Sequence, residues 1–181
     1  KHGPKPFTSE TGKWAQKVLG VRKDDVNVGW VIHGALEMLP VIVNVGGNDF
    51  MLHGTDLIYV NPKGIIGQKQ FSNYGYKSPL IVDFMDTWQG GNLSLQVHPT
   101  MAYSQEVFNS DFGHHESYYM MDTNPDSSVY LGLKEEVEIP DFIDALNDAQ
   151  TTGEFNDEKY VNRIPMKKHD HIFVPGGTVH C

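Results

Sequence analysis

Short apolar runs separated by glycine and proline fill much of the first half of the chain. Runs at residues 28–32, 40–45, 49–52 and 57–61 are rich in β-branched, aromatic and other apolar side chains, which favour extended strands. Gly-Gly-Asn, Gly-Thr and Pro-Lys-Gly breaks stand between them, and such breaks are typical of turns. Several short strands at close intervals predict a sandwich or barrel.

Strand-like runs continue in the second half. Residues 79–86, 93–97 and 128–133 are predicted strands, and a Gly90-Gly91-Asn92 turn precedes the second of them. The segment 100–115 is mostly polar. We expect it to form a loop or a short helix over the mouth of the barrel.

Helical patterns occur at two places. Residues 8–11 offer a helix N-cap, and Trp14, Val18 and Leu19 follow at helical spacing. Between residues 140 and 152 a proline begins a segment with an apolar stripe, formed by Phe142, Ile143, Leu146 and Ala149. We predict a short N-terminal helix and a second helix that packs against the outside of the β domain.

Composition and charge narrow the class of protein. The 181 residues are 39% hydrophobic and 11% aromatic, which indicates a folded domain. We expect a leader with a short helix over residues 1–22 and one β domain over residues 23–181. A net charge of −9 disfavours nucleic acid and anionic membranes as partners, because both attract clustered Lys and Arg. The sequence has no apolar run long enough to span a bilayer.

The strongest chemical signal is a set of donor side chains at strand-like positions. Gln96 and His98 are two residues apart, so both project from one face of an extended strand while Val97 projects from the other. Glu116 begins an aromatic-rich run, and His180 follows a Pro-Gly-Gly turn. We predict that Gln96, His98, Glu116 and His180 converge on one metal ion.

The donor types indicate which metals fit. Two imidazoles, one carboxylate and one amide oxygen suit Zn²⁺, Mn²⁺, Co²⁺ or Fe²⁺. The set contains no thiolate, so a closed structural zinc site is not expected. Each residue taken singly has an ordinary explanation as a hydrogen-bonded or solvated side chain. The agreement of spacing and turn chemistry favours the metal site.

The donor set and the turn before its last member are similar to the two motifs of the cupin superfamily. Gln96 stands where that superfamily commonly has His, and His169 stands where it has Gly. More narrowly, LSLQVHP, ESYYMMD, VYLGLKE and MKKHDHIFVPGGTVHC resemble type I phosphomannose isomerase (mannose-6-phosphate isomerase), in a longer bacterial branch. The resemblance covers residues 79–181 strongly and residues 10–78 loosely.

The resemblance implies a mainly β fold, a cupin jelly-roll barrel or sandwich with a few peripheral helices. It also implies an enzyme that interconverts mannose 6-phosphate and fructose 6-phosphate through an enediolate. The cofactor would be one divalent metal, with zinc expected, and the partner a small sugar phosphate. One carboxylate among four ligands leaves about one positive charge at the site, which stabilises the enediolate oxygen.

Further site residues follow from the resemblance and from strand alternation. Ser94 lies two residues before Gln96, and the family uses this serine near the substrate. Asp83 stands where most members have Lys; it is a candidate general base, a partner for a cation, or a structural aspartate. Of His114 and His115, which precede Glu116, one could point to the pocket to orient a ligand or move a proton; His115 is the candidate.

Two lysines and the single cysteine complete the candidates. Lys167 and Lys168 could bind the substrate phosphate, and a solvated charged turn is the alternative. Cys181 cannot form an internal disulfide, so a reducing cytoplasm is the simplest setting.

The ends of the sequence indicate a piece of a longer protein. The chain begins without Met and ends at Cys181, one residue after a predicted ligand, whereas type I isomerases carry further pocket residues after that motif. We expect this piece to bind metal with weak or absent isomerase activity on its own, and its natural partner to be the rest of the parent chain. The alternative function is a non-catalytic metal-binding cupin module that binds or senses a sugar.

Overall fold

The computed structural model describes residues 9–18, 28–32, 40–78, 81–87 and 93–181. The chain divides into two compact units, Lys1–Gly91 and Asn92–Cys181. The domain boundary expected after residue 22 lies outside the described residues, as do Leu19, the predicted turn at 90–92 and the first two residues of the predicted strand 79–86.

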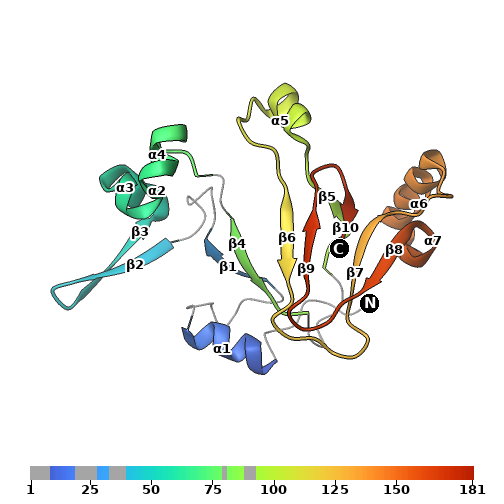
Figure 1. The fold of residues 1–181 in the computed structure, drawn as a ribbon, viewed down its shortest axis with the longest axis horizontal. Coiled ribbons are helices and arrows are strands. Elements are labelled where there is room, and N and C mark those ends of the chain that lie inside the picture. The colour runs from blue at the N-terminus through green and yellow to red at the C-terminus, as the bar shows by residue number, and fades with distance from the viewer. Residues whose placement is uncertain (1–8, 19–27, 33–39, 79–80, 88–92) are drawn as a thin grey trace. The chain divides into compact units, whose positions relative to one another are not determined.

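Helices and short antiparallel strands make up the first unit (Figure 1). Strand β1 pairs with β4, and β2 pairs with β3, in both cases antiparallel. The described elements of this unit are α1 (Glu10–Val18), β1 (Val28–Ile32), β2 (Pro40–Val45), β3 (Asn48–His53), α2 (Gly54–Val60), α3 (Pro62–Ile65), α4 (Gln68–Tyr74) and β4 (Val82–Met85).

The predicted N-terminal helix is confirmed, but its buried face differs from the prediction. Ser9 Oγ accepts a 2.8 Å hydrogen bond from the Gly12 main-chain N–H and so caps α1. Gly12 and Ala15 are buried, whereas Trp14 is 43% exposed and Val18 57%. The small residues therefore form the packed face, because they let the helix backbone approach its neighbours closely.

The strands predicted at residues 40–45 and 49–52 are confirmed and form the hairpin β2–β3, but the strand predicted next is wrong. Gly46 and Gly47 form the hairpin turn with positive φ angles of 60° and 86°. Residues 57–61 were predicted as a strand, and they fall mostly in helix α2. Its first turn is capped by Asp56, whose Oδ2 accepts from the His53 N–H at 3.1 Å. This local capping outweighs the β propensity of the apolar residues that follow.

The second unit contains six strands and three helices within the described residues. One sheet has the order β5-β10-β7-β8, and β6 pairs separately with β9; every pairing is antiparallel. Its elements are β5 (Gln96–Val97), α5 (Met101–Phe108), β6 (Glu116–Tyr119), β7 (Ser128–Leu133), α6 (Ile139–Thr152), α7 (Asp157–Tyr160), β8 (Val161–Pro165), β9 (His171–Val174) and β10 (Val179–His180).

Packing in this unit follows the pattern predicted for residues 140–152. Helix α6 begins after Glu138, carries Pro140 in its first turn and ends at Gly153, whose φ is 69°. Phe142 is buried against Tyr160, Val161 and Val179. Ring centroids of Phe142 and Tyr160 lie 5.5 Å apart. The helix thereby covers the four-stranded sheet, as the apolar stripe indicated, although Ile143 is half exposed.

The predicted fold class is confirmed only in part. The sheets are antiparallel, and segment 100–115 does contain a short helix, α5, capped by Thr100. A mainly β composition is wrong for the described residues, since their seven helices contain more residues than their ten strands. Nor do the described strands close into one barrel, because they fall into one four-stranded sheet and three two-stranded sheets.

None of the helices in the described ranges is both long and apolar enough to cross a membrane.

Candidate metal centre

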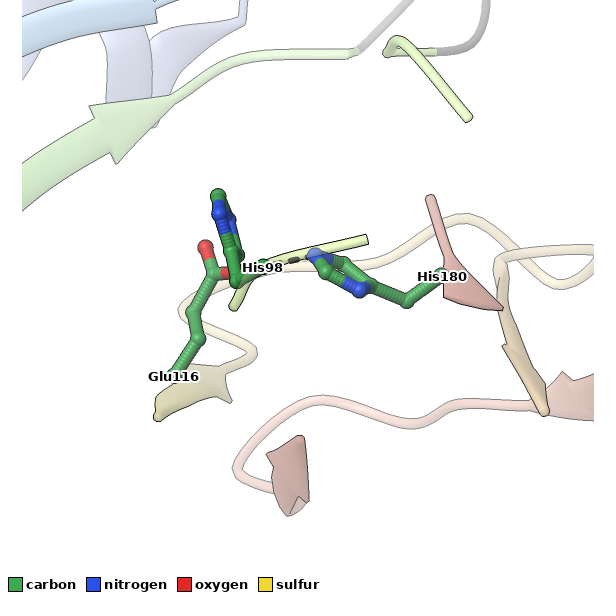
Figure 2. Close-up of side chains that lie close together, drawn as sticks. All are labelled: His98, Glu116 and His180. Atoms are coloured by element: carbon green, nitrogen blue, oxygen red, sulfur yellow. Dashed lines mark ion pairs between the residues drawn. The ribbon is translucent and has the colours of Figure 1, made fainter. Parts of the chain in front are cut away.

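Three of the four predicted ligands meet in the second unit. His98 directly follows β5, Glu116 begins β6 and His180 ends β10. Their ligand atoms all lie within 4.8 Å of one another. Figure 2 shows the three side chains pointing toward a common centre from separate segments of the chain. This His/Glu/His group could hold a metal ion.

His180 is the most constrained of the three ligands. Its strand β10 lies between β5 and β7, pairing His180 with Gln96 on one side and Leu131 on the other, and its side chain is 0% exposed. The Nδ1 atom lies 2.8 Å from the Thr178 carbonyl oxygen. A carbonyl can only accept, so Nδ1 carries the proton and Nε2 keeps its lone pair for a metal.

Glu116 places a carboxylate oxygen between the two imidazoles. Its Oε2 lies 3.0 Å from His180 Nε2 and 3.2 Å from His98 Nε2. The atom is buried, and these approaches do not have hydrogen-bond geometry. A buried acceptor without a hydrogen bond is unfavourable. A divalent cation bound by all three donors would remove that deficiency, so these residues fit a metal.

Gln96 lies at the edge of this group. Its amide Nε2 is 3.5 Å from His180 Nε2, and its side chain is otherwise exposed. The oxygen and nitrogen of an amide can exchange places by rotation about the terminal bond. After that rotation the amide oxygen points at the ligand side of His180, where it could serve as a fourth donor.

Burial sets the protonation of the histidines around the cluster. Burial has the largest effect on His98 and lowers its pKa. The Glu116 carboxylate raises this pKa in part, and His180 lowers it further by a smaller amount. Burial likewise lowers the pKa of His114, whose ring stacks on His98, and the His98 ring adds to this effect. Neutral imidazoles with free lone pairs are the form that binds metal.

Two further groups border the cluster. Tyr118 lies two residues after Glu116 and is buried. Its burial, and to a smaller extent the negative charge of Glu116, raise the pKa of its phenol. Burial raises the pKa of the Cys181 thiol to about 11, and the Sγ atom donates to the Leu93 carbonyl at 2.9 Å. Cys181 is therefore a protonated thiol at neutral pH and a poor metal ligand.

No family model matches the chain. Individual proteins do match it. It is 31% identical over 111 residues to mannose-6-phosphate isomerase ManA of Bacillus subtilis, an alignment that covers 59% of this chain and 31% of that protein. It is 27% identical over 130 residues to a mannose-6-phosphate isomerase of Streptococcus mutans, with 70% of this chain and 35% of that protein covered.

Over the aligned part, this chain is similar to mannose-6-phosphate isomerases.

The solved structure of the Bacillus subtilis mannose 6-phosphate isomerase shares its fold. The TM-score is 0.61 at 19% identity, over 98% of this chain and 51% of that structure. The chain thus spans about a third of the length of its curated relatives and half of the solved one.

The other predicted site residues lie at different distances along the chain from the ligand cluster and in different surroundings. Ser94 is exposed two residues before Gln96. The His115 Nδ1 atom accepts a 3.0 Å hydrogen bond from the Gly176 N–H, which ties it to the turn before His180. Asp83 lies on β4 in the first unit and is half-buried.

The structure does not bring Lys167 and Lys168 to the ligand cluster. Both are exposed in the turn between β8 and β9. In the β6–β9 ladder, Glu116 pairs with Val174 at one end, whereas the lysine turn lies beyond the opposite end. Lys168 Nζ is 3.8 Å from Asp122 Oδ1 in that region.

Of the two histidines that precede Glu116, the sequence favoured His115, but it is His114 that the structure stacks on the cluster. Its ring centroid lies 3.7 Å from that of His98, with an angle of 13° between the planes. Strand alternation could have identified it, because residues 114, 116 and 118 share one face of an extended segment while His115 faces the other way.

Proposed function

We propose that this chain carries the metal centre of an isomerase that interconverts mannose 6-phosphate and fructose 6-phosphate. The observation that supports it most is that the ligand atoms of His98, Glu116 and His180, from separate segments of the chain, lie within 4.8 Å of one another. The substrate class comes from the relatives, which are named mannose-6-phosphate isomerases. In this proposal zinc is the resident metal and the protein acts in the cytoplasm.

Each ligand has a distinct part in this proposal. A bound divalent cation would supply a Lewis acid for the substrate's carbonyl oxygen. Glu116 contributes the single negative charge among the proposed donors, so a positive charge remains to stabilise an oxyanion. His180 is held by Thr178 and cannot rotate away without losing its 2.8 Å hydrogen bond. Gln96 adds a neutral donor, which preserves that positive charge.

Proton transfer between C1 and C2 needs a base beside the metal. Ser94, near Gln96, is proposed to contact the sugar, and His115 to move or relay the proton. Asp83, on β4 of the first unit, is the carboxylate that the sequence offers as a general base. A base acts only within hydrogen-bonding distance of the proton it removes, so these three assignments are separable by single substitutions.

A second candidate function is a metal-binding module that recognises a sugar without turnover. It is favoured because several cations of the second unit are engaged in contacts with other residues of that unit. The cations of this unit are Lys134, Lys159, Arg163, Lys167 and Lys168. Lys134 Nζ donates to the Glu158 carbonyl and Arg163 to Ser128, while Lys168 lies near Asp122.

Metal analysis combined with a coupled isomerase assay tests both candidates. Purified protein, both as the 181-residue chain and within its parent protein, is assayed for bound zinc and for conversion of mannose 6-phosphate. His180→Ala and Gln96→Ala serve as site variants. If the isomerase proposal is right, the parent protein converts mannose 6-phosphate, and this activity is lost when the metal is removed by a chelator and in the His180→Ala variant. Sugar binding without turnover in the parent protein selects the module, and absence of metal from the wild type rejects both.

A further inference from the structure

The two histidine ligands of the cluster are held in different ways. The ring of His180 is oriented by the hydrogen bond between its Nδ1 and the Thr178 carbonyl, the usual arrangement for a metal-binding histidine. Within the described residues, no hydrogen bond reaches Nδ1 of His98. Something else must fix the plane of that ring if its Nε2 is to point at the cluster.

His114 lies where it can do this. Its imidazole stacks on that of His98 with the centroids 3.7 Å apart and the planes 13° from parallel. Two planar rings at that separation are in van der Waals contact over their whole faces. Rotation of the His98 ring about its Cβ–Cγ bond would drive its edge into His114, so the stack blocks it on one side.

The backbone of His114 is itself fixed relative to His98. The His114 N–H donates to the carbonyl of Pro99, the residue after His98, at 3.1 Å. On the other side, a Cβ at Gly176 would lie 3.0 Å from the His114 carbonyl oxygen, so the Gly176 backbone packs closely there. Because this segment is held between two neighbours, its side chain can act as a rigid support.

We propose that His114 is a positioning residue, which stacks on His98 and holds that imidazole in the orientation required for metal binding. The proposal rests on the metal centre proposed above. His114 itself is outside the three-residue ligand group, so the inference assigns it a flat supporting surface and no bond to the metal. A phenyl ring should replace it, whereas a small or non-planar side chain should not.

Cobalt binding provides the test, because Co²⁺ reports both affinity and geometry through its visible absorption. The wild type, His114→Phe, His114→Ala and His114→Leu are titrated with Co²⁺, with far-UV circular dichroism confirming folding of each. We expect His114→Phe to stay within about threefold of the wild-type affinity and His114→Ala and His114→Leu to lose about tenfold or more, with an altered spectrum. His169→Ala is the matched control; it removes an exposed histidine that contacts Tyr119 beyond the far end of β6, and should bind as the wild type does.

The outcomes separate this inference from the proposed function. If the wild type binds no Co²⁺ and no zinc, the metal centre itself is wrong. If the wild type binds and His114→Ala binds equally well, stacking has no positioning role. Equal losses in His114→Phe and His114→Ala would show that a ring nitrogen is needed, which also overturns the inference. The leucine variant decides the matter if the alanine variant does not fold.

Discussion

The main-chain N–H of Gly177 donates a 2.7 Å hydrogen bond to the carbonyl of His98. This bond joins the turn before one proposed metal ligand, His180, to the backbone of another, His98. The two bonded residues, Gly177 and His98, are 79 positions apart in the sequence. The neighbouring Gly176 N–H donates to His115 Nδ1, next to the third ligand, Glu116. The Pro-Gly-Gly turn therefore connects the segments that carry all three ligands.

Gly176→Ala should weaken metal binding by crowding these segments. The new Cβ would lie 2.8 Å from the Pro99 carbonyl oxygen and 3.0 Å from that of His114, and both contacts are with backbone. Relief requires the segments that carry His98 and Glu116 to move apart. We expect about a tenfold or larger loss of zinc affinity, measured by competition with a chromophoric chelator.

Gly132→Ala is the control for that prediction. Gly132 has a φ of 75°, but a Cβ there would meet only Asn162, at an ordinary 3.7 Å. Backbone strain should lower the free energy of unfolding by about 1–2 kcal/mol without affecting zinc affinity. Equal losses of zinc affinity in the two variants would mean that general destabilisation, not crowding of the turn, weakens the site.

Removing the metal should lower the melting temperature, and Glu116→Gln should abolish that effect. Ligand binding to the folded state alone stabilises it, by about 2.7 kcal/mol at a free metal concentration of 100 Kd. The Gln side chain removes the charged oxygen that lies 3.0 and 3.2 Å from the two imidazoles. Differential scanning fluorimetry with zinc and with EDTA measures the difference. A wild-type melting temperature that is the same under both conditions contradicts the metal centre.

Gln96→Glu should separate metal affinity from turnover. The side chain of Gln96 lies beside His180 Nε2, so a carboxylate there would bind a cation more tightly and also neutralise its remaining positive charge. We expect higher zinc affinity together with a kcat at least tenfold lower in the parent protein. Gln96→Ala should weaken zinc binding instead. Zinc affinity unchanged in both variants would exclude Gln96 from the ligand set.

Lys167→Ala combined with Lys168→Ala should change the affinity for mannose 6-phosphate by less than twofold. The two lysines lie beyond the end of the β6–β9 ladder opposite to Glu116, and Lys168 is near Asp122. Isothermal titration with the sugar phosphate measures the change. A loss of tenfold or more would show that this turn binds the phosphate, as the sequence suggested, and that the substrate approaches from that end.

Asp86→Ala should destabilise the first unit without affecting the metal. Ser9 donates to Asp86 Oδ2 through both its hydroxyl, at 2.7 Å, and its main-chain N–H, at 3.2 Å, and both residues are buried. Loss of the acceptor should reduce the free energy of unfolding by about 1–3 kcal/mol in urea. Glu10→Ala, which breaks an exposed pair with Lys13, should change it by less than about 0.5 kcal/mol.

Local features of this protein are determined by the sequence itself. The N-cap at Ser9, helix α6 with its buried Phe142, and the Gly46-Gly47 hairpin turn each depend on residues only a few positions apart. Backbone geometry over such a span leaves few alternatives. The same reasoning puts Gln96 and His98 on one face of a strand, and the structure places both beside His180.

Tertiary structure decided what depends on distant pairings. His114 contacts His98, while His115 binds Gly176, because the register of β6 against β9 and the position of the turn before His180 fix which side faces the cluster. The lysine turn lies at the other end of the same ladder. Alternation specifies two faces of a strand, but only burial and register across the folded chain determine which face meets the ligands.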